Sequence, residues 1–152
     1  MRWLLITGVL AAGAVMAQEA LPPLPEDYCR WERKGFAIPQ PLCGLQGDPK
    51  RGRALALDPH GGNCIACHQV PAPEVPFQGT IGPPLTGVGS RYDEGELRLR
   101  VVDEQQVNPA TIMPGFYRDP RLANRVADDY WGKTFLTAQQ VEDIVAWLVT
   151  LK

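Results

Sequence analysis

The 152-residue sequence has little net charge and few histidines and cysteines. Its 15 Lys and Arg residues stand against 17 Asp and Glu residues, so the net charge is −2 and there is no basic stripe. Proteins that bind nucleic acids need such a stripe to neutralise phosphates, and this class of partner is therefore excluded. Only 2 His and 4 Cys residues are present, so any site built from them depends on their spacing.

No apolar run of the chain reaches the length of a membrane-spanning helix, which needs about 20 residues. The apolar run at residues 3–15 follows Arg2 and ends at the start of Val15-Met16-Ala17, which is the pattern of an export signal. We therefore expect cleavage after about Ala17 and no membrane span in the mature chain. The alternative is that residues 1–17 stay in place as an uncleaved anchor.

Proline and glycine are abundant, at 15 residues each, which predicts many loops and little sheet. Residues 18–47 are interrupted by prolines and cannot form one long helix. They are expected to be an N-terminal extension of a single domain at residues 48–152. Within that domain we expect helices at 50–57, at 94–103 and after Thr137. Asp48 is expected to cap the first of them, and Thr137 with Gln140 forms a capping box for the last.

The segment Cys64-Ile65-Ala66-Cys67-His68 has the pattern of a c-type haem attachment site. Two thiols at this spacing reach the two vinyl groups of one haem, and His68 then lies under the iron as the proximal ligand. A zinc site would need a second pair of ligands at suitable spacing, and a thioredoxin-like site would need a βαβ pattern. Neither is present. One covalent haem c is expected, and its attachment outside the cytoplasm favours the bacterial periplasm.

Met113 is the expected second axial ligand. The other two methionines leave with the signal, so Met113 is the only thioether of the mature chain. Pro114 favours an extended backbone at Met113, which allows its side chain to lie across the haem from His68. The competing ligand, His60, lies on the proximal side and is expected to be exposed. Ordinary core packing is the remaining alternative for Met113.

Cys29 and Cys43 lie in the extension, outside the haem motif. In an oxidising compartment two spare cysteines are expected to pair. A bridge that closes a loop of about 15 residues would stabilise the fold by about 3 kcal/mol. The alternative is that one of the two thiols binds a metal ion or a partner.

Residues 48–152 resemble the class I cytochromes c along their whole length. A narrower resemblance is to the SoxX family of monohaem cytochromes. It is carried by the cysteine-containing extension and by the segments Gly62–His68, Gly82–Tyr92 and Asn108–Tyr117. The resemblance implies an all-α class I cytochrome c fold, with a few helices around one haem. It also implies that the Pro83 carbonyl accepts a hydrogen bond from the second ring nitrogen of His68.

The resemblance to SoxX implies an electron-transfer subunit with no catalysis of its own. SoxX forms a heterodimer with SoxA, a dihaem or monohaem cytochrome, and SoxAX is an L-cysteine S-thiosulfotransferase that joins thiosulfate to a cysteine of the carrier complex SoxYZ. This chain would accept the released electrons and pass them to a small soluble cytochrome c. The alternatives are a free-standing electron shuttle and a haem enzyme or gas sensor with a displaceable methionine.

Overall fold

The computed structural model describes residues 23–122 and 126–152, so the predicted signal at residues 1–17 lies outside the described range. This part of the chain contains no β-strand, only an isolated bridge between Lys34 and Ala37. The helices are α1 (Pro49–Leu57), α2 (Val88–Arg91), α3 (Glu94–Asp103) and α4 (Ala138–Thr150), with 3-10 turns η1 (Leu42–Gly44), η2 (Cys64–Ala66), η3 (Glu104–Gln106), η4 (Pro120–Leu122) and η5 (Asp128–Tyr130). The prediction of an all-α fold rich in loops is confirmed.

The three predicted helices begin where their capping side chains indicate. Asp48 accepts hydrogen bonds from the backbone of residues 50 and 51 at the start of α1. The capping box of Thr137 and Gln140 is present at α4, and a second box of Asp93 and Glu96 starts α3. The sequence did not predict the short helix α2, whose four residues are too few to show a periodic pattern.

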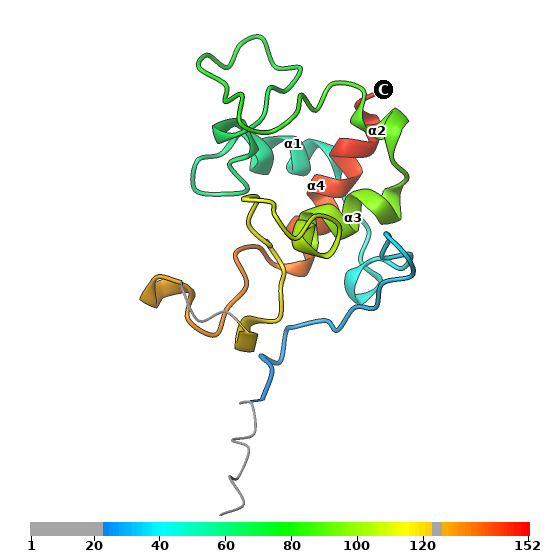
Figure 1. Ribbon diagram of the computed structural model, residues 1–152, viewed down its shortest axis with the longest axis vertical. Helices are drawn as coiled ribbons and strands as arrows, with labels where there is room; N and C mark the ends of the chain where they lie inside the picture. Colours follow the sequence, from blue (N-terminus) through cyan, green and yellow to red (C-terminus); the bar gives the residue numbers. More distant parts are fainter. Residues whose placement is uncertain (1–22, 123–125) are drawn as a thin grey trace, which may run out of the picture.

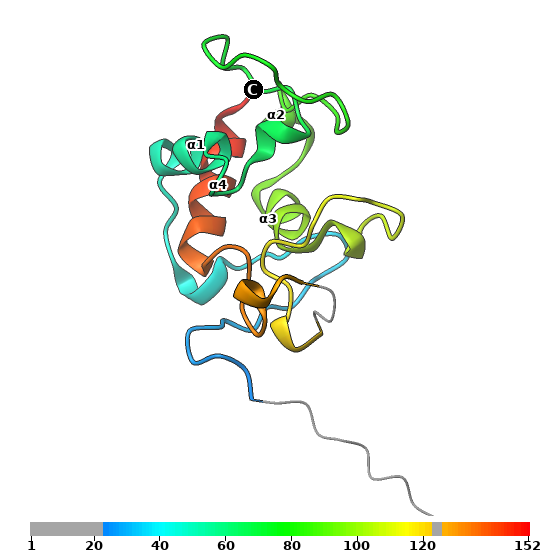
Figure 2. The ribbon, with the colours of Figure 1, turned by 90° about the vertical axis from the view of Figure 1, so that its left-hand side faces the viewer.

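Helices α1 and α4 cross at close range, as the two ribbon views show (Figure 1, Figure 2). Gly52 makes this possible, because a Cβ atom there would overlap the backbone oxygen of Asp143 on α4. Arg51 then reaches the Asp143 carboxylate through Nε at 2.8 Å and one further nitrogen at 2.8 Å. The crossing therefore combines a backbone contact with an ion pair at its edge.

The core lies where α3 and α4 face each other. Apolar residues of both helices are buried here. These core residues are Val141, Ile144, Val145, Trp147 and Leu148 on α4, and Leu97, Leu99, Val101 and Val102 on α3. Leu97 and Leu99 lie on opposite sides of α3 at 3.6 residues per turn, so this helix is enclosed on more than one side.

A buried ion pair joins the two helices to the extension. Arg98 of α3 and Glu142 of α4 are 1% and 2% exposed, with Nε and Oε1 2.8 Å apart. Glu142 also accepts the backbone N–H of Leu42 at 2.8 Å, and Arg98 donates to the Ile38 carbonyl at 2.9 Å. The extension is therefore fastened to the core by groups that no sequence pattern had indicated.

The Cys29–Cys43 disulfide is present, with the two Cα atoms 5.5 Å apart. The predicted pairing is confirmed. In Figure 1 the extension, in blue and cyan, runs below α3 and past the yellow loop that follows it. None of the helices in the described part of the chain has the length and hydropathy that a bilayer crossing requires.

Candidate haem site

A cavity of about 930 Å³ opens between the haem motif, α3, the loop after α3 and α4. Its lining includes Cys64, Cys67 and His68 from the motif, Pro83 from the next loop, and Met113 from the loop after α3. The fold thus brings together five predicted site residues that span about a third of the chain. The volume lies within the usual range of cofactor and ligand pockets.

The two thiols are held by a tight turn that follows α1. The Gly62 N–H donates to the Leu55 carbonyl at 2.9 Å, which folds the chain back on the helix. Asn63 has φ +47°, a left-handed conformation that asparagine tolerates better than most residues. The Cys64 carbonyl then accepts hydrogen bonds from the backbone of residues 67 and 68. This turn keeps Cys64, Cys67 and the next side chain against one cavity.

Burial raises the pKa of the Cys64 thiol to about 11. The free thiol is therefore protonated at neutral pH, unlike the low-pKa thiolates of redox cysteines. Among the described residues, no group of three or more His, Cys, Asp or Glu side chains could hold a metal ion. These observations weigh against the zinc and redox alternatives for the motif.

The orientation of the His68 imidazole is set by the segment that begins at Gly82. Its Nδ1 lies 2.7 Å from the Pro83 carbonyl oxygen. A carbonyl can only accept, so Nδ1 carries the proton and Nε2 keeps its lone pair for a metal. Gly82 packs directly on the ring, and a Cβ atom there would overlap the imidazole. The Gly82 N–H also donates to the Cys67 carbonyl at 2.8 Å, which anchors this segment on the motif.

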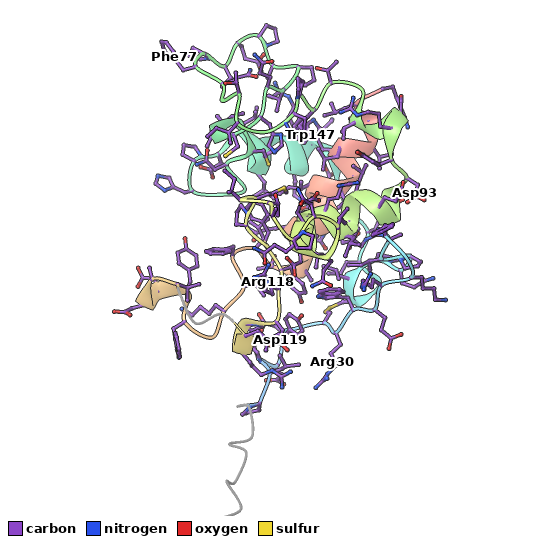
Figure 3. The ribbon with its side chains drawn as sticks, viewed as in Figure 1. Arg30, Phe77, Asp93, Arg118, Asp119 and Trp147 are labelled. Atoms are coloured by element: carbon purple, nitrogen blue, oxygen red, sulfur yellow. A yellow bond between two sulfur atoms is a disulfide. The ribbon has the colours of Figure 1, made fainter. Side chains whose placement is uncertain are left out.

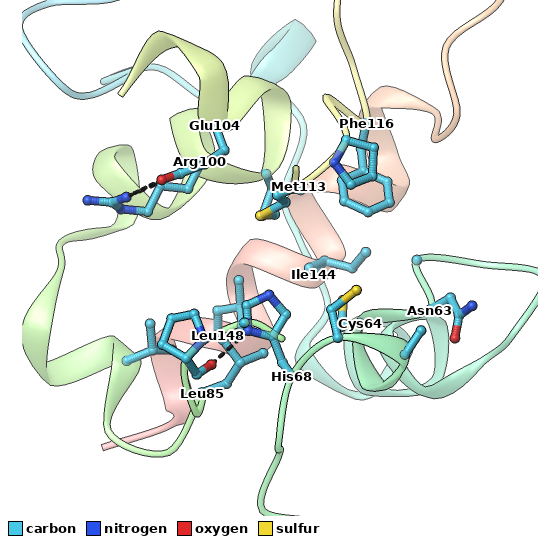
Figure 4. Close-up of a pocket in the computed structure, with 18 of the residues that line it drawn as sticks. Asn63, Cys64, His68, Leu85, Arg100, Glu104, Met113, Phe116, Ile144 and Leu148 are labelled. Atoms are coloured by element: carbon cyan, nitrogen blue, oxygen red, sulfur yellow. Dashed lines mark hydrogen bonds and ion pairs between the residues drawn. The ribbon is translucent and has the colours of Figure 1, made fainter. Parts of the chain in front are cut away.

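Met113 lies across the cavity from His68, with its sulfur directed toward the enclosed space (Figure 4). It is half-buried, and its N–H donates to Thr111 Oγ1 at 3.1 Å. His60, by contrast, is exposed at the rim of the cavity, on the segment that precedes Cys64. The geometry therefore favours Met113 over His60 as the residue opposite His68.

The rest of the lining suits a flat apolar group with carboxylates at its edge. The apolar wall consists of Leu85, Val88, Leu97, Val101, Phe116, Ile144 and Leu148. Arg100 adds a cation: its Nε is buried and has no partner among the described residues, while its Nη1 binds Glu104 at 2.8 Å. Its guanidinium carbon lies 4.0 Å from the centre of the Tyr92 ring. A buried unpaired N–H of this kind fits a haem propionate.

Arg100 and Gly82 are the site residues for which the sequence had suggested no role. Several arginines occur in and near α3, and nothing in their spacing marks Arg100 as the one beside the cavity. Gly82 was part of the quoted motif, but its contact with the His68 ring depends on how the loop returns over residues 67–69. Both roles follow from contacts between distant segments.

Comparison with known proteins agrees with this geometry. The family model described as cytochrome c matches residues 49–152. A chain of the crystal structure of SoxXA from P. pantotrophus is similar, with 39% sequence identity and a TM-score of 0.72, over 80% of this chain and 94% of that chain. No curated protein sequence matches. The expected cofactor, one covalent haem c, is supported by both matches. The chain belongs to the cytochrome c family.

Proposed function

We propose that Cys64 and Cys67 attach the haem and that His68 and Met113 bind its iron from opposite sides. The observation that carries this assignment is that the two thiols, the imidazole and the thioether line one cavity, although Met113 is 45 residues beyond His68 in the sequence. Bound haem supplies a one-electron Fe(III)/Fe(II) couple. With His68 and Met113 both available to ligate the iron, bound haem would have no open position for a substrate, which favours electron transfer over catalysis.

The surrounding residues keep that centre fixed. Pro83 holds the His68 ring in one orientation and tautomer, which strengthens the ligand. Arg100 would pair with a propionate of the bound haem, and the apolar wall would limit the access of water to it. A low-dielectric site with fixed ligands reorganises little between its two oxidation states, which favours fast electron transfer.

The chain acts as the SoxX-type subunit of a periplasmic SoxAX heterodimer. This proposal is supported by the 39% identity with a chain of the SoxXA structure and by the match over 94% of that chain. In this role the chain accepts electrons when a SoxA-type subunit joins thiosulfate to a cysteine of SoxYZ, and it passes them to a small soluble cytochrome c. Residues 1–17 are the signal, 18–47 the extension and 48–152 the cytochrome domain.

Purification of the untagged protein from its native host tests the assembly. A second c-type cytochrome is expected in stoichiometric amount with this chain. Thiosulfate together with the carrier protein is then expected to reduce the haem, and a carrier whose acceptor cysteine is replaced by serine is the matched control. A monomer whose haem is indifferent to thiosulfate would overturn the SoxX role and leave a free-standing electron shuttle.

Carbon monoxide separates electron transfer from gas sensing. The ferrous wild-type protein is expected to bind carbon monoxide poorly, because Met113 occupies the sixth position. The Met113→Ala variant is expected to bind it readily. Ready binding by the wild-type protein would contradict six-coordination and would favour the sensor or enzyme alternative.

A further inference from the structure

We propose that Tyr117 is a positioning residue for Met113 and that the disulfide-closed extension holds Tyr117 in place. This inference rests on the proposed ligation of iron by Met113. Tyr117 follows Met113 by four residues and is 1% exposed. Its side chain points away from the cavity lining and toward the extension, so that any effect on the iron must act through the position of the loop.

The loop that carries Met113 is fastened to the end of α3 on its C-terminal side. The backbone N–H groups of Phe116 and Tyr117 donate to the carbonyls of Val101 and Val102 at 3.2 and 3.1 Å. These carbonyls belong to the last turn of α3, where a helix leaves its acceptors free. The loop thus takes its direction from the backbone at Phe116 and Tyr117.

The next residue along the chain, Arg118, forms an ion pair with the end of α3. Arg118 donates from Nη2 and Nε to the two oxygens of Asp103 at 2.5 and 3.1 Å, and from Nη2 to Gln105 at 2.8 Å. Asp103 is buried at the end of α3, and Figure 3 shows Arg118 below that helix. This pair fixes the chain directly after Tyr117, and the extension fixes the Tyr117 side chain.

The Tyr117 side chain makes the contact with the extension. Its hydroxyl oxygen accepts the backbone N–H of Cys29 at 2.7 Å, across 88 residues of sequence. Its ring stacks on Tyr28, with the ring centres 4.9 Å apart and the planes 9° from parallel. The bond is partly buried, so water has limited access to the Cys29 N–H, and Tyr117 supplies the partner that this donor needs.

The disulfide gives this contact its support. Cys29 is bonded to Cys43, and the neighbouring Leu42 donates its N–H to buried Glu142 at 2.8 Å. A covalent link and one hydrogen bond therefore connect the Cys29 backbone to the ion-paired core of α3 and α4. The bridge restricts where the Cys29 N–H can lie, and so reduces the entropy lost when Tyr117 binds it.

The measurable consequence is the ease with which an outside ligand displaces Met113. A loop that is free to move away should yield its thioether more readily to imidazole, a weak ligand of ferric haem. Loss of the Tyr117 hydroxyl leaves the Cys29 N–H unsatisfied, and the free-energy scale of such a loss corresponds to a change of about tenfold in an equilibrium constant.

The test titrates ferric holoprotein with imidazole and follows the far-red charge-transfer band of methionine-ligated haem. Tyr117→Phe is expected to bind imidazole about tenfold more tightly than wild type. Tyr28→Phe is the matched control, because it removes a hydroxyl from the same stacked pair without touching the Cys29 bond, and it is expected to stay within about twofold of wild type. The Cys29→Ser/Cys43→Ser double variant is expected to resemble Tyr117→Phe. It is used in place of thiol reductants because they would also reduce the haem.

Combination of the changes shows whether they act through one contact. If the disulfide works through Tyr117, the triple variant should bind imidazole no more tightly than either parent, since a shared interaction can be lost only once. Unchanged imidazole affinity in Tyr117→Phe overturns the proposal, as does an equal shift in Tyr28→Phe. If the double cysteine variant fails to fold, the imidazole affinity of Tyr117→Phe alone decides whether the positioning role holds. If the wild-type protein lacks the far-red band, the ligation by Met113 itself is overturned. If the band is present but the variants bind imidazole as the wild type does, only the positioning role is overturned.

Discussion

Replacement of Glu142 by Gln removes the negative charge from the buried ion pair that joins α3, α4 and the extension. Glu142 accepts hydrogen bonds from Arg98 Nε at 2.8 Å, from Arg98 Nη2 at 2.9 Å and from the Leu42 N–H at 2.8 Å. Glutamine has the same shape but one carbonyl oxygen in place of the carboxylate. Arg98 would therefore stay charged and buried, with Glu94 as its remaining carboxylate partner.

The expected loss in the free energy of unfolding is about 3–5 kcal/mol, the usual cost of leaving one member of a buried pair uncompensated. Glu94 binds the same guanidinium at 2.6 Å, but its side chain is 61% exposed. An exposed pair of this kind contributes about 0–1 kcal/mol. Glu94→Gln is therefore the control with the same cation and the same chemical change; its carboxylate differs in being exposed and in lacking the Leu42 contact.

Guanidinium-induced unfolding of the ferric holoproteins, followed by far-ultraviolet circular dichroism at neutral pH, measures both variants. Glu142→Gln should lose about 2 kcal/mol or more beyond Glu94→Gln, by the two ranges above. That difference is a large part of the stability of an ordinary domain. Equal losses, each below about 1 kcal/mol, would show that the Arg98 charge does not depend on the α4 carboxylate and would refute the reasoning.

Further variants test the site and the helix crossing. Met113→Ala should abolish the far-red charge-transfer band, and its persistence would exclude Met113 as the ligand. Gly82→Ala should displace the proximal imidazole and lower the yield of haem-loaded protein, measured by pyridine haemochrome; an unchanged yield and spectrum would contradict the close packing. Gly52→Ala should lower the free energy of unfolding by about 1–3 kcal/mol despite the better helix propensity of alanine, because the added methyl overlaps the Asp143 backbone; a gain in stability would be the contrary result. Burial raises the pKa of Asp143, but hydrogen bonds, chiefly from Arg51, leave it below its usual value. The contribution of the Asp143 carboxylate to the free energy of unfolding should therefore be complete above about pH 4 and lost as the pH falls through the folded pKa. Asp143→Asn should flatten the dependence of stability on pH in that acid range.

Local chemistry in the sequence was enough to predict the three longer helices and the haem motif. Asp48, Thr137 and Gln140 mark helix starts because their side chains bind backbone N–H groups only two or three residues away. The spacing of Cys64, Cys67 and His68 matches one haem for a similarly local reason. The pairing of Cys29 with Cys43 needed only a count of spare cysteines and an oxidising compartment.

The assignment of Met113 also began with a count, since the other two methionines lie within the predicted signal at residues 1–17. It remains a prediction, but the fold adds the placement of Met113 across the cavity from His68. That placement depends on the backbone bonds from Phe116 and Tyr117 to α3. The sequence alone could show that Met113 was available as a ligand. The direction of its loop depends on the position of α3, which ends ten residues earlier.

Tertiary structure alone decided the contacts between distant segments. The approach of Gly52 to α4, the buried pairing of Arg98 with Glu142 and the bond from Cys29 to Tyr117 each join residues far apart in the chain. Charge, polarity and the lack of a side chain are visible in a sequence, but the partner of each group is not. A buried arginine or a close helix crossing is stable only when a particular distant atom lies beside it, and the packing of the whole chain determines which atom that is.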